Sequence, residues 1–539
     1  MIRRYLLAAP VCLLMAFGCS REASIENREA ALVDRAVVAI DTGPISGARA
    51  ESDDKAWVYK GIPFAAPPVG DRRWRPPQRV APWTEVRDAT RFGAACLQSL
   101  RAEGSFYGQI VDRMDEDCLY LNVWTAVEPT AKAPVMVWIH GGGLTSGHGA
   151  EATYDGTTLA RRGAVVITIN YRLGPLGYFA HPLLAAESQH GSSGNYGVLD
   201  QIAALQWVQQ NVSRFGGDPG RVTIFGESAG SWSVNHLVAS PLAKGLFHRA
   251  IAQSGGAFGS FGTVSAKSEV QAASEKLASK LMPDGSAPTL EALRARTGDE
   301  ILAAGRGAGR LSANVDGWVF PDTVWNIFAA GRQNNVPVIL GSNGDEGSSL
   351  GAGRGPATLA DYRRFSAETY GALASEFLAV YPAKRDEDVL EARVASYTDQ
   401  SFGWEMRTWA RMMRTVSSNA YLYFFSRVIP GDDAGRLRAF HAGEIVYVFG
   451  NLGKSPHQYA NRAYDDTDRR LSEALVSYWI NFAKSGDPNG EGLPAWPSYS
   501  RDADQSMEFG NTIEVRTGIR ASRLDFMDRF YRAQRGDTN

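Results

Sequence analysis

The chain has 539 residues, of which 44% are hydrophobic and 21% are charged, and its formal net charge is −2. This globular composition comes with enough length for a large core. The net charge is close to zero, whereas nucleic-acid binding usually requires a basic face, so we expect no nucleic-acid partner. A chain of this length can form several domains, but large α/β enzymes also run this long as one domain.

The first residues have the layout of an export signal. Arg3 and Arg4 form a basic start, and the apolar run that follows is too short for a comfortable transmembrane helix. The run ends in Ala-Phe-Gly-Cys-Ser, which resembles a bacterial lipoprotein cleavage site with Cys19 as the lipidated residue. We predict a signal peptide over residues 1–19 and a protein that is periplasmic, secreted or lipid-anchored at the cell envelope. Ordinary cleavage a few residues later is the alternative to lipidation.

Cysteine usage agrees with export. Two of the four cysteines, Cys12 and Cys19, lie in the predicted signal, which leaves Cys96 and Cys118 in the mature chain. An oxidising compartment permits a bridge between them. Such a bridge would close a loop of roughly twenty residues and contribute about 3 kcal/mol through loop entropy. Two buried free thiols are the alternative.

Apolar segments bounded by turn residues alternate with helical patterns along the chain. The segments that read as buried strands are residues 133–140, 163–171, 221–226, 336–341 and 420–426. They are apolar on both faces, as strands covered by helices on both sides should be. Residues 198–212 read as a helix, and the polar helical region 265–313 is expected to form a cap or side layer. The pattern predicts an α/β fold with a mostly parallel sheet in one domain, over residues 30–535.

Three consecutive glycines, Gly141, Gly142 and Gly143, follow the first of these strands. Glycines let backbone N–H groups turn toward a substrate oxygen, so this segment is a candidate oxyanion hole. Phosphate binding is the competing interpretation, but no Gly-Lys-Ser/Thr follows the glycines.

The segment Gly226-Glu227-Ser228-Ala229-Gly230 lies between a strand pattern and a helical pattern and fits the G-x-S-x-G nucleophile elbow. A serine in such a strained turn needs neighbours without bulk two residues away, and its hydroxyl is exposed above the carboxyl end of a strand. The N-terminus of the following helix favours negative charge there. Ser228 is therefore the candidate nucleophile, and the Ala229 N–H is a further candidate oxyanion donor.

A serine nucleophile needs a base. His236 lies about 12 Å further along the same helix, and His248 is next to another buried strand pattern, so both are expected to be structural. His441 lies in a loop between a strand and an aromatic helix start. It is the best candidate by position, and His457, in a polar loop, is the second.

The base needs an acid to hold its tautomer, and in this architecture the acid lies between serine and histidine in the chain. Asp345 and Glu346 stand side by side directly after the strand at 336–341. The carboxyl ends of strands are where sites gather in α/β sheets. By spacing alone, either residue can serve.

With these parts in order, the sequence resembles the type B carboxylesterase family, which includes the cholinesterases. The match covers almost all of the mature chain, through segments such as YKGIPFAAPPVGDRRWRPPQ, EDCLYLNVW, HGGG, NYRLGPLGYF, GESAG and FHAGEIVYVFG. The resemblance implies the α/β-hydrolase fold: a large mixed, mostly parallel central sheet flanked by helices, with loop and helical insertions that form a gorge or cap. It also implies a serine hydrolase that cleaves carboxylic esters through an acyl-enzyme, with no metal or organic cofactor.

The resemblance also assigns residues. It makes Glu346, not Asp345, the triad acid and His441 the base that serves Ser228. It makes Gly142, Gly143 and Ala229 the oxyanion donors and pairs Cys96 with Cys118. It suggests buried ion pairs that brace the loops beneath the site, Arg73–Glu116 and Arg172–Asp200, and it puts Glu227 and Ser254 around the base.

The sequence departs from the family pattern in the presumed pocket. Leu144 stands where phenylalanine is usual, and the loop between the two cysteines has no tryptophan, so a choline ester is not expected as the substrate. The only aromatic residues of the loop between the two cysteines are Phe106 and Tyr107.

Some features leave alternatives open. Phe258 and Phe261 fit pocket or core positions equally well. Three arginines, Arg306, Arg310 and Arg354, either face an acidic substrate or lie in solvated loops.

Specificity stays open at this stage. The same machinery serves carbamates, amides, lactones, polyesters or polycarboxylate esters, because pocket shape decides the substrate. A non-catalytic binding protein on this fold is the least favoured alternative, because every catalytic part is present. The small-molecule ester, the oligomeric state and the acyl chain length are not specified by the sequence.

Overall fold

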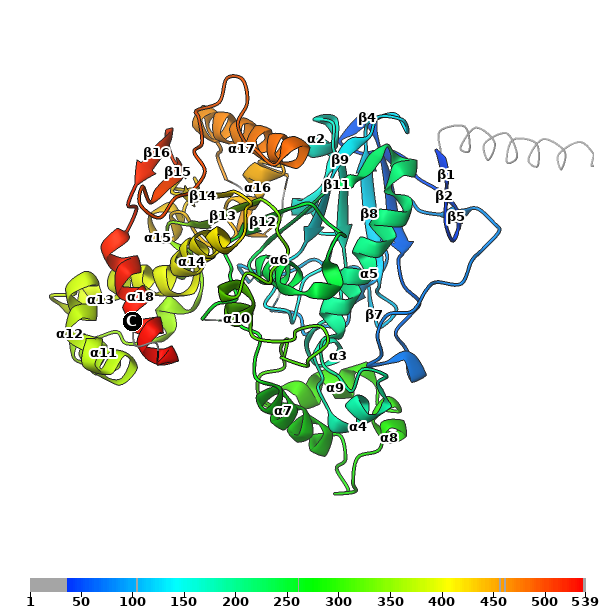
Figure 1. Ribbon diagram of the computed structural model, residues 1–539, viewed down its shortest axis with the longest axis horizontal. Helices are drawn as coiled ribbons and strands as arrows, with labels where there is room; N and C mark the ends of the chain where they lie inside the picture. Colours follow the sequence, from blue (N-terminus) through cyan, green and yellow to red (C-terminus); the bar gives the residue numbers. More distant parts are fainter. Residues whose placement is uncertain (1–35, 103–104, 260, 455–456, 460–461, 537–539) are drawn as a thin grey trace, which may run out of the picture.

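The structure is a computed structural model that describes residues 36–536 except 103–104, 260, 455–456 and 460–461. The expected signal peptide over residues 1–19, with Cys19, lies outside the described residues. The chain folds around an 11-stranded sheet with strand order β16-β15-β14-β13-β12-β11-β9-β10-β8-β4-β3 (Figure 1). None of the described helices is long and apolar enough to cross a membrane.

The middle of this sheet is parallel and its edges are antiparallel. The parallel strands are β9 (Ala133–Ile139), β10 (Val165–Ile169), β11 (Gly217–Glu227), β12 (Arg249–Gln253), β13 (Val338–Asn343), β14 (Ala420–Phe425) and β15 (Gln505–Phe509). The antiparallel strands are β3 (Ala48–Ala50), β4 (Asp53–Pro63), β8 (Tyr120–Thr125) and β16 (Ile513–Thr517). All five strands expected from the sequence are present, and the sheet is mixed and mostly parallel.

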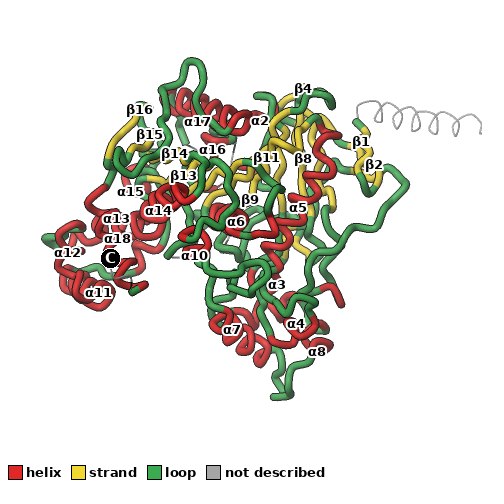
Figure 2. The backbone as a smooth tube through the Cα atoms, viewed as in Figure 1, coloured by secondary structure: helices red, strands yellow, loops and turns green. Residues whose placement is uncertain are grey.

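Alternation along β9 explains why the central strands are apolar on both faces. Val135, Val137 and Ile139 belong to one core cluster, while Met136 and Trp138 between them belong to the other, and all five are fully buried. Successive side chains of a strand point to opposite faces, and each fully buried aliphatic side chain contributes roughly 1.5–3 kcal/mol. Both faces of the sheet are therefore covered by helices (Figure 2).

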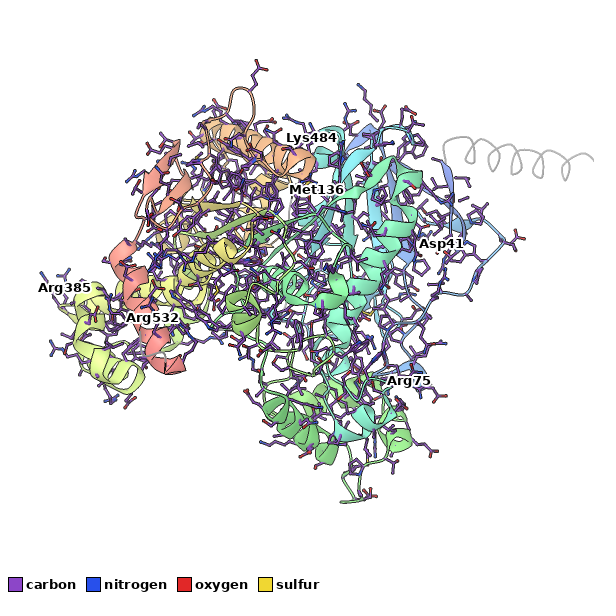
Figure 3. All side chains as sticks on the ribbon, viewed as in Figure 1. Asp41, Arg75, Met136, Arg385, Lys484 and Arg532 are labelled. Carbon is purple, nitrogen blue, oxygen red and sulfur yellow. A yellow bond between two sulfur atoms is a disulfide. The ribbon has the colours of Figure 1, made fainter. Side chains whose placement is uncertain are left out.

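The helices that cover the two faces come from different parts of the chain. The first core cluster is closed by α5 (Tyr196–Asn211), α6 (Ala229–Ala239) and α14 (Trp404–Met412), and the second by α2 (Thr157–Arg161) and α17 (Asp466–Ser485). Asp465 caps α17, because its carboxylate accepts a hydrogen bond from the Asp468 N–H at 3.0 Å. In Figure 3 the charged Arg385 lies at the edge of the molecule, whereas Met136 lies within the sheet.

Two helical insertions flank the sheet. The first is α7 (Lys267–Lys280), α8 (Leu290–Arg294) and α9 (Gly298–Gly305), which pack with α4 (Pro182–Glu187) and α3 (Gly174–Gly177) at the lower end of Figure 1. It is the polar helical region expected over 265–313, and it forms a side layer. The second is α11 (Leu359–Tyr370), α12 (Ala374–Val380) and α13 (Asp386–Thr398), against which the C-terminal α18 (Ala521–Arg535) packs.

Short elements complete the described chain. The short helices are α10 (Val324–Ala329), α15 (Ala434–Leu437) and α16 (Ile445–Val448), and a π-helical turn spans Asp399–Gly403. The short strands are β1 (Val37–Ile40), β2 (Gly43–Ser46), β5 (Arg87–Asp88), β6 (Ala95–Cys96) and β7 (Met114–Asp115).

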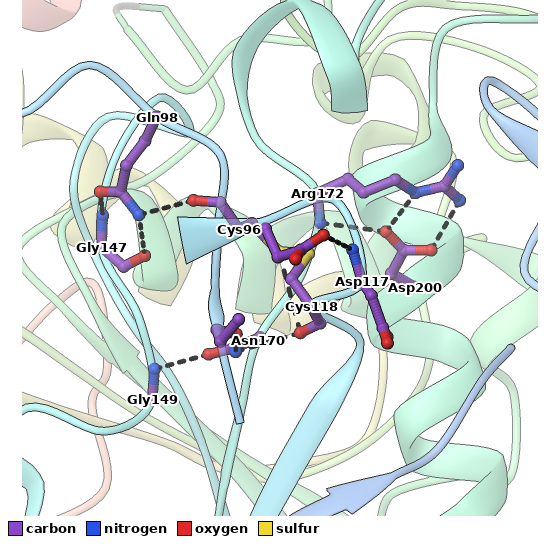
Figure 4. The surroundings of a disulfide bond; sticks show 11 residues. Cys96, Gln98, Asp117, Cys118, Gly147, Gly149, Asn170, Arg172 and Asp200 are labelled. Atoms are coloured by element: carbon purple, nitrogen blue, oxygen red, sulfur yellow. Dashed lines mark hydrogen bonds and ion pairs between the residues drawn. A yellow bond between two sulfur atoms is a disulfide. The ribbon is translucent and has the colours of Figure 1, made fainter. Parts of the chain in front are cut away.

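The expected cross-links are present. Cys96 and Cys118 form a disulfide, which confirms the pairing (Figure 4). The Arg73 Nε lies 2.7 Å from Glu116 Oε2, and the Arg172 Nη2 lies 2.7 Å from Asp200 Oδ1. Arg172 and Asp200 are both buried, so this pair links the chain after β10 to helix α5 inside the core.

Candidate active site

Ser228 lies at a sharp turn between strand β11 and helix α6. Its φ of 56° and ψ of −121° are values that residues with a side chain rarely adopt. A Cβ at Gly226 would lie 2.6 Å from the carbonyl carbon of Gly230, and one at Gly230 would lie 2.0 Å from the Ile139 oxygen. Both flanking positions therefore require glycine, which is the physical reason for the G-x-S-x-G pattern.

Ser228 opens into a cavity of about 300 Å³ at the carboxyl end of the sheet. His441 lines the same cavity, although no hydrogen bond joins the two side chains among the described residues. The other lining residues include three glycines, several aromatic and aliphatic side chains, and two charged side chains. They are Gly141, Gly142, Gly143, Tyr107, Trp232, Phe261, Leu350, Tyr397, Phe402, Ile445, Arg101 and Glu151.

The structure separates the two adjacent acids. Glu346 is fully buried and its Oε2 lies 2.5 Å from His441 Nδ1, while its Oε1 accepts a hydrogen bond from the Asn343 N–H at 2.7 Å. The Asp345 carboxylate instead contacts Arg438 at 3.2 Å. Of the two candidates that spacing left open, Glu346 is therefore the one in contact with the histidine.

Negative charge surrounds the imidazole of His441. Its Nε2 lies 3.1 Å from Glu227 Oε1, a contact that lacks hydrogen-bond alignment and so acts through charge. Burial alone lowers the pKa of His441, but the charges of Glu227 and Glu346 outweigh burial and raise the pKa to about 9. Burial also raises the pKa of Glu227 well above its usual range. A proton on Glu227 would weaken its share of the field on the imidazole.

Glu444 is a buried acid that sequence reasoning did not single out. Its Oε1 accepts a hydrogen bond from Gln253 at 3.0 Å and its Oε2 accepts one from Asn343 at 2.6 Å. Burial raises its pKa, with the Glu346 charge adding to the effect. The available signal was its position in FHAGEIVYVFG, three residues after the candidate base.

Backbone donors without a partner among the described residues lie near Ser228: Gly142 and Gly143 line the cavity, and Ala229 follows the serine at the start of α6. Gly142 and Gly143 have φ values of 103° and 67°, and a Cβ at Gly142 would lie 2.1 Å from the Ser146 oxygen. The N–H groups of Gly142, Gly143 and Ala229 donate no hydrogen bond to another described residue. Unpaired donors beside a nucleophile can accept a developing negative charge, as an oxyanion hole requires.

Several other predicted residues make no hydrogen bond to His441 among the described residues. Ser254, directly after β12, is fully buried, and its hydroxyl has no hydrogen-bond partner in the described part of the chain. His236 is buried in α6, where its Nε2 lies 2.8 Å from the Gly262 oxygen and burial lowers its pKa to about 4. His248 accepts a hydrogen bond from the Val222 N–H. The side chain of His457 is outside the described part of the chain.

Of the phenylalanines and arginines that the sequence offered for the pocket, only Phe261 lines the cavity in the described structure. Phe258 packs in the core at 4% exposure, whereas Phe261 is 51% exposed and lines the cavity. None of the arginines Arg306, Arg310 and Arg354 lines the cavity in the described structure, and Arg310 donates to the Phe261 and Thr263 carbonyls. The arginine that lines the cavity is Arg101, and a further acid in its lining is Glu151, whose pKa burial raises to about 7. No sequence pattern marked either residue.

A family model described as the carboxylesterase family matches residues 34–527. The chain belongs to the carboxylesterase family. This carboxylesterase is 36% identical over 491 residues to the fumonisin B1 esterase of Sphingopyxis macrogoltabida, covering 88% of this chain and 87% of the relative. It is 33% identical over 497 residues to the para-nitrobenzyl esterase of Bacillus subtilis (strain 168), covering 89% of this chain and 96% of the relative.

Solved structures agree with this assignment. A PNB esterase superposes with a TM-score of 0.79 at 31% identity, covering 91% of this chain and 99% of that chain. The family resemblance and the α/β-hydrolase fold expected from the sequence are confirmed. The protein is a carboxylic-ester hydrolase.

Proposed function

We propose that this carboxylesterase hydrolyses small-molecule carboxylic esters through a Ser228–His441–Glu346 triad and an acyl-enzyme intermediate. The observation that carries the proposal is the convergence of a strained serine, a buried histidine–glutamate pair and free backbone donors on one cavity. These are the parts that nucleophilic acyl transfer needs.

The geometry supports a role for each group. The Ser228 oxygen attacks the ester carbonyl while His441 takes its proton, and Glu346 stabilises the imidazolium through Nδ1. The oxyanion accepts hydrogen bonds from the free N–H groups of Gly142, Gly143 and Ala229. His441 then returns the proton to the leaving alcohol. In the second half it deprotonates a water molecule, which releases the acid and restores Ser228.

The cavity favours a compact ester. Its volume of about 300 Å³ and the side chains of Phe261, Leu350 and Phe402 suit an apolar acyl or alcohol group, while Arg101 and Glu151 provide polar ends.

We further propose that the enzyme is exported and that Cys19 carries a lipid anchor, from the basic and apolar start of the chain.

The first test is hydrolysis of 4-nitrophenyl esters from acetyl to dodecanoyl by wild type and Ser228→Ala. We expect turnover of short chains by the wild type and a loss of about a thousandfold or more in the variant, because no other group supplies the nucleophile. Circular dichroism checks that both proteins are folded.

Two results would contradict the proposal. Turnover retained by Ser228→Ala would exclude this serine as the nucleophile. Folded wild-type protein that hydrolyses no ester of the series would exclude a general esterase and favour an amide, carbamate or lactone substrate.

A further inference from the structure

The loop between Cys96 and Cys118, which we call the disulfide loop, reaches the active site from outside the central sheet. It is described except for residues 103–104. Four of its described residues line the catalytic cavity: Arg101, Tyr107, Gly108 and Gln109. The loop also makes hydrogen bonds to both halves of the site, buried ones to the oxyanion segment and partly buried ones to the loops of the acid and the base.

The first attachment joins the loop to the oxyanion segment. The Gln98 side chain is 3% exposed, and its amide pairs with both backbone groups of Gly147 (Figure 4). Its Nε2 donates to the Gly147 oxygen at 3.0 Å, and its Oε1 accepts from the Gly147 N–H at 2.7 Å. A Cβ at Gly147 would lie 2.6 Å from the Gly141 oxygen, so this backbone packs directly on the segment that carries Gly142 and Gly143.

A neighbouring contact ties the disulfide itself to the same segment. The Asn170 side chain donates to the Cys118 carbonyl at 3.0 Å, and its Oδ1 accepts a hydrogen bond from the Gly149 N–H at 2.8 Å (Figure 4). Gly147 and Gly149 are thus held from two points of one cross-linked loop. A buried amide that satisfies both backbone groups fixes the position of a segment and not only its proximity.

The second attachment joins the loop to the acid and the base. The Tyr107 hydroxyl lies 2.9 Å from the carbonyl oxygen of His441 and 2.7 Å from the hydroxyl of Ser349. Ser349 follows the Glu346 turn, and its hydroxyl accepts a hydrogen bond from the His441 N–H at 3.3 Å. Phe106 packs edge-on against Phe440, the residue before the base, with ring centroids 5.2 Å apart.

Proton counting shows that these contacts form a closed ring. A carbonyl oxygen only accepts, so the single phenol proton of Tyr107 goes to the His441 oxygen. The Ser349 hydroxyl therefore donates to Tyr107 at 2.7 Å, in preference to the Glu346 carbonyl at 3.4 Å. Ser349 in turn accepts from the His441 N–H, which closes the ring through both catalytic loops. Burial raises the pKa of Tyr107 well above its usual value, so the donor keeps its proton.

We propose that the disulfide loop positions the catalytic groups, with Gln98 fixing the oxyanion segment and Tyr107 holding the Glu346 turn and the His441 loop in register. The proposal deepens the proposed function and rests on it. Tyr107 and Gln98 are positioning residues, because their hydrogen bonds reach the catalytic loops and not a reacting atom. Small errors of placement are costly for catalysis, and about 1 Å is enough to lower the rate about a hundredfold.

The decisive variant is Tyr107→Phe, which keeps the ring in the cavity wall and removes only the hydroxyl. We expect kcat to fall about tenfold with KM nearly unchanged. The acidic limb of kcat/KM should move to lower pH, because a looser Glu346 contact holds the imidazolium less well. The matched control is Tyr478→Phe, whose hydroxyl donates to the Pro494 carbonyl at 2.7 Å in the core and does not line the cavity.

A double-mutant cycle tests the ring itself. Ser349→Ala breaks the ring from the other side, so Tyr107→Phe/Ser349→Ala should lower kcat no further than the worse single variant. A Tyr107→Phe enzyme with the kcat and pH profile of Tyr478→Phe would overturn the proposal, as would fully additive losses in the double variant. Either result leaves the proposed function standing, because that function fails only if Ser228→Ala stays active or if the folded wild type hydrolyses none of the esters.

Discussion

Asp345 and Glu346 are neighbours in one turn, yet their carboxylates have opposite surroundings. The Asp345 carboxylate is partly exposed and pairs with Arg438, whereas the Glu346 side chain has no exposure and holds the His441 ring. A buried carboxylate with an aligned backbone donor and an imidazole partner has a fixed geometry, and that is what a group that orients a base requires. The difference between the two acids is therefore one of environment and not of residue type.

Substitution of each acid by its amide is the corresponding test. We expect Glu346→Gln to lower kcat about a thousandfold or more, because a neutral amide cannot stabilise the imidazolium. Asp345→Asn should stay within about tenfold of wild type, since it changes only a partly exposed ion pair. Steady-state kinetics on one nitrophenyl ester compares the two, and the reverse ranking would assign the acid to Asp345.

The sequence could predict the order of the catalytic residues, because elbow, acid and base each follow a strand pattern that is local in the chain. Spacing alone could not choose between Asp345 and Glu346, and only the family resemblance assigned Glu346, since the choice depends on Asn343, Arg438 and His441 meeting in space. Nor could it find Tyr107 as a partner of His441, because no spacing rule relates a loop residue to a turn that lies far along the chain.

At the scale of elements, the turn from β11 to α6 is fixed by crowding between backbones. Helix α6 begins so close to β9 that the Ile139 carbonyl occupies the space a side chain at Gly230 would need. The turn therefore holds the serine by steric exclusion as well as by the hydrogen bond from the Ser228 N–H to the Gln253 oxygen at 2.9 Å. The fold predicted for this element from sequence was correct because its glycines report this crowding directly.

The substitution Gly230→Ala tests whether steric crowding at this turn, and not helix propensity, requires the glycine. The added methyl group forces α6 away from β9, and we expect a loss of about 1–3 kcal/mol in stability together with a marked loss of kcat. The control is Gly435→Ala in α15, where a Cβ meets nothing within 4 Å and stability should hold or rise slightly. Thermal melts and esterase assays compare the two variants. Equal stability and equal kcat in both would argue against steric crowding at the nucleophile elbow.

At the scale of the whole molecule, buried ion pairs connect segments that are distant in the chain. Arg172 follows β10 and Asp200 lies in α5, and their side chains are 4% and 0% exposed. A charge left alone in such a place has lost its hydration without compensation. This pair therefore links the sheet to the helix layer more strongly than the many surface pairs do.

Removing one carboxylate from a buried ion pair and one from an exposed ion pair measures how differently the two kinds of pair affect stability. Asp200→Asn should cost about 3–5 kcal/mol, because the Arg172 guanidinium stays buried without its carboxylate. Glu473→Gln breaks the exposed pair with Arg162 and should cost about 1 kcal/mol or less. Denaturant melts of the two variants give both values, and a small loss in Asp200→Asn would mean that water reaches the buried site.

The three proposed catalytic side chains follow β11, β13 and β14, and the last of these strands comes late in the chain. A chain that is synthesised from its N-terminus presents the serine long before the histidine exists. The base is also among the last parts to dock, because domains fold as units once their chain is available. The nascent protein therefore lacks its proposed base until the greater part of the chain has been made, and the serine alone is a poor nucleophile until then.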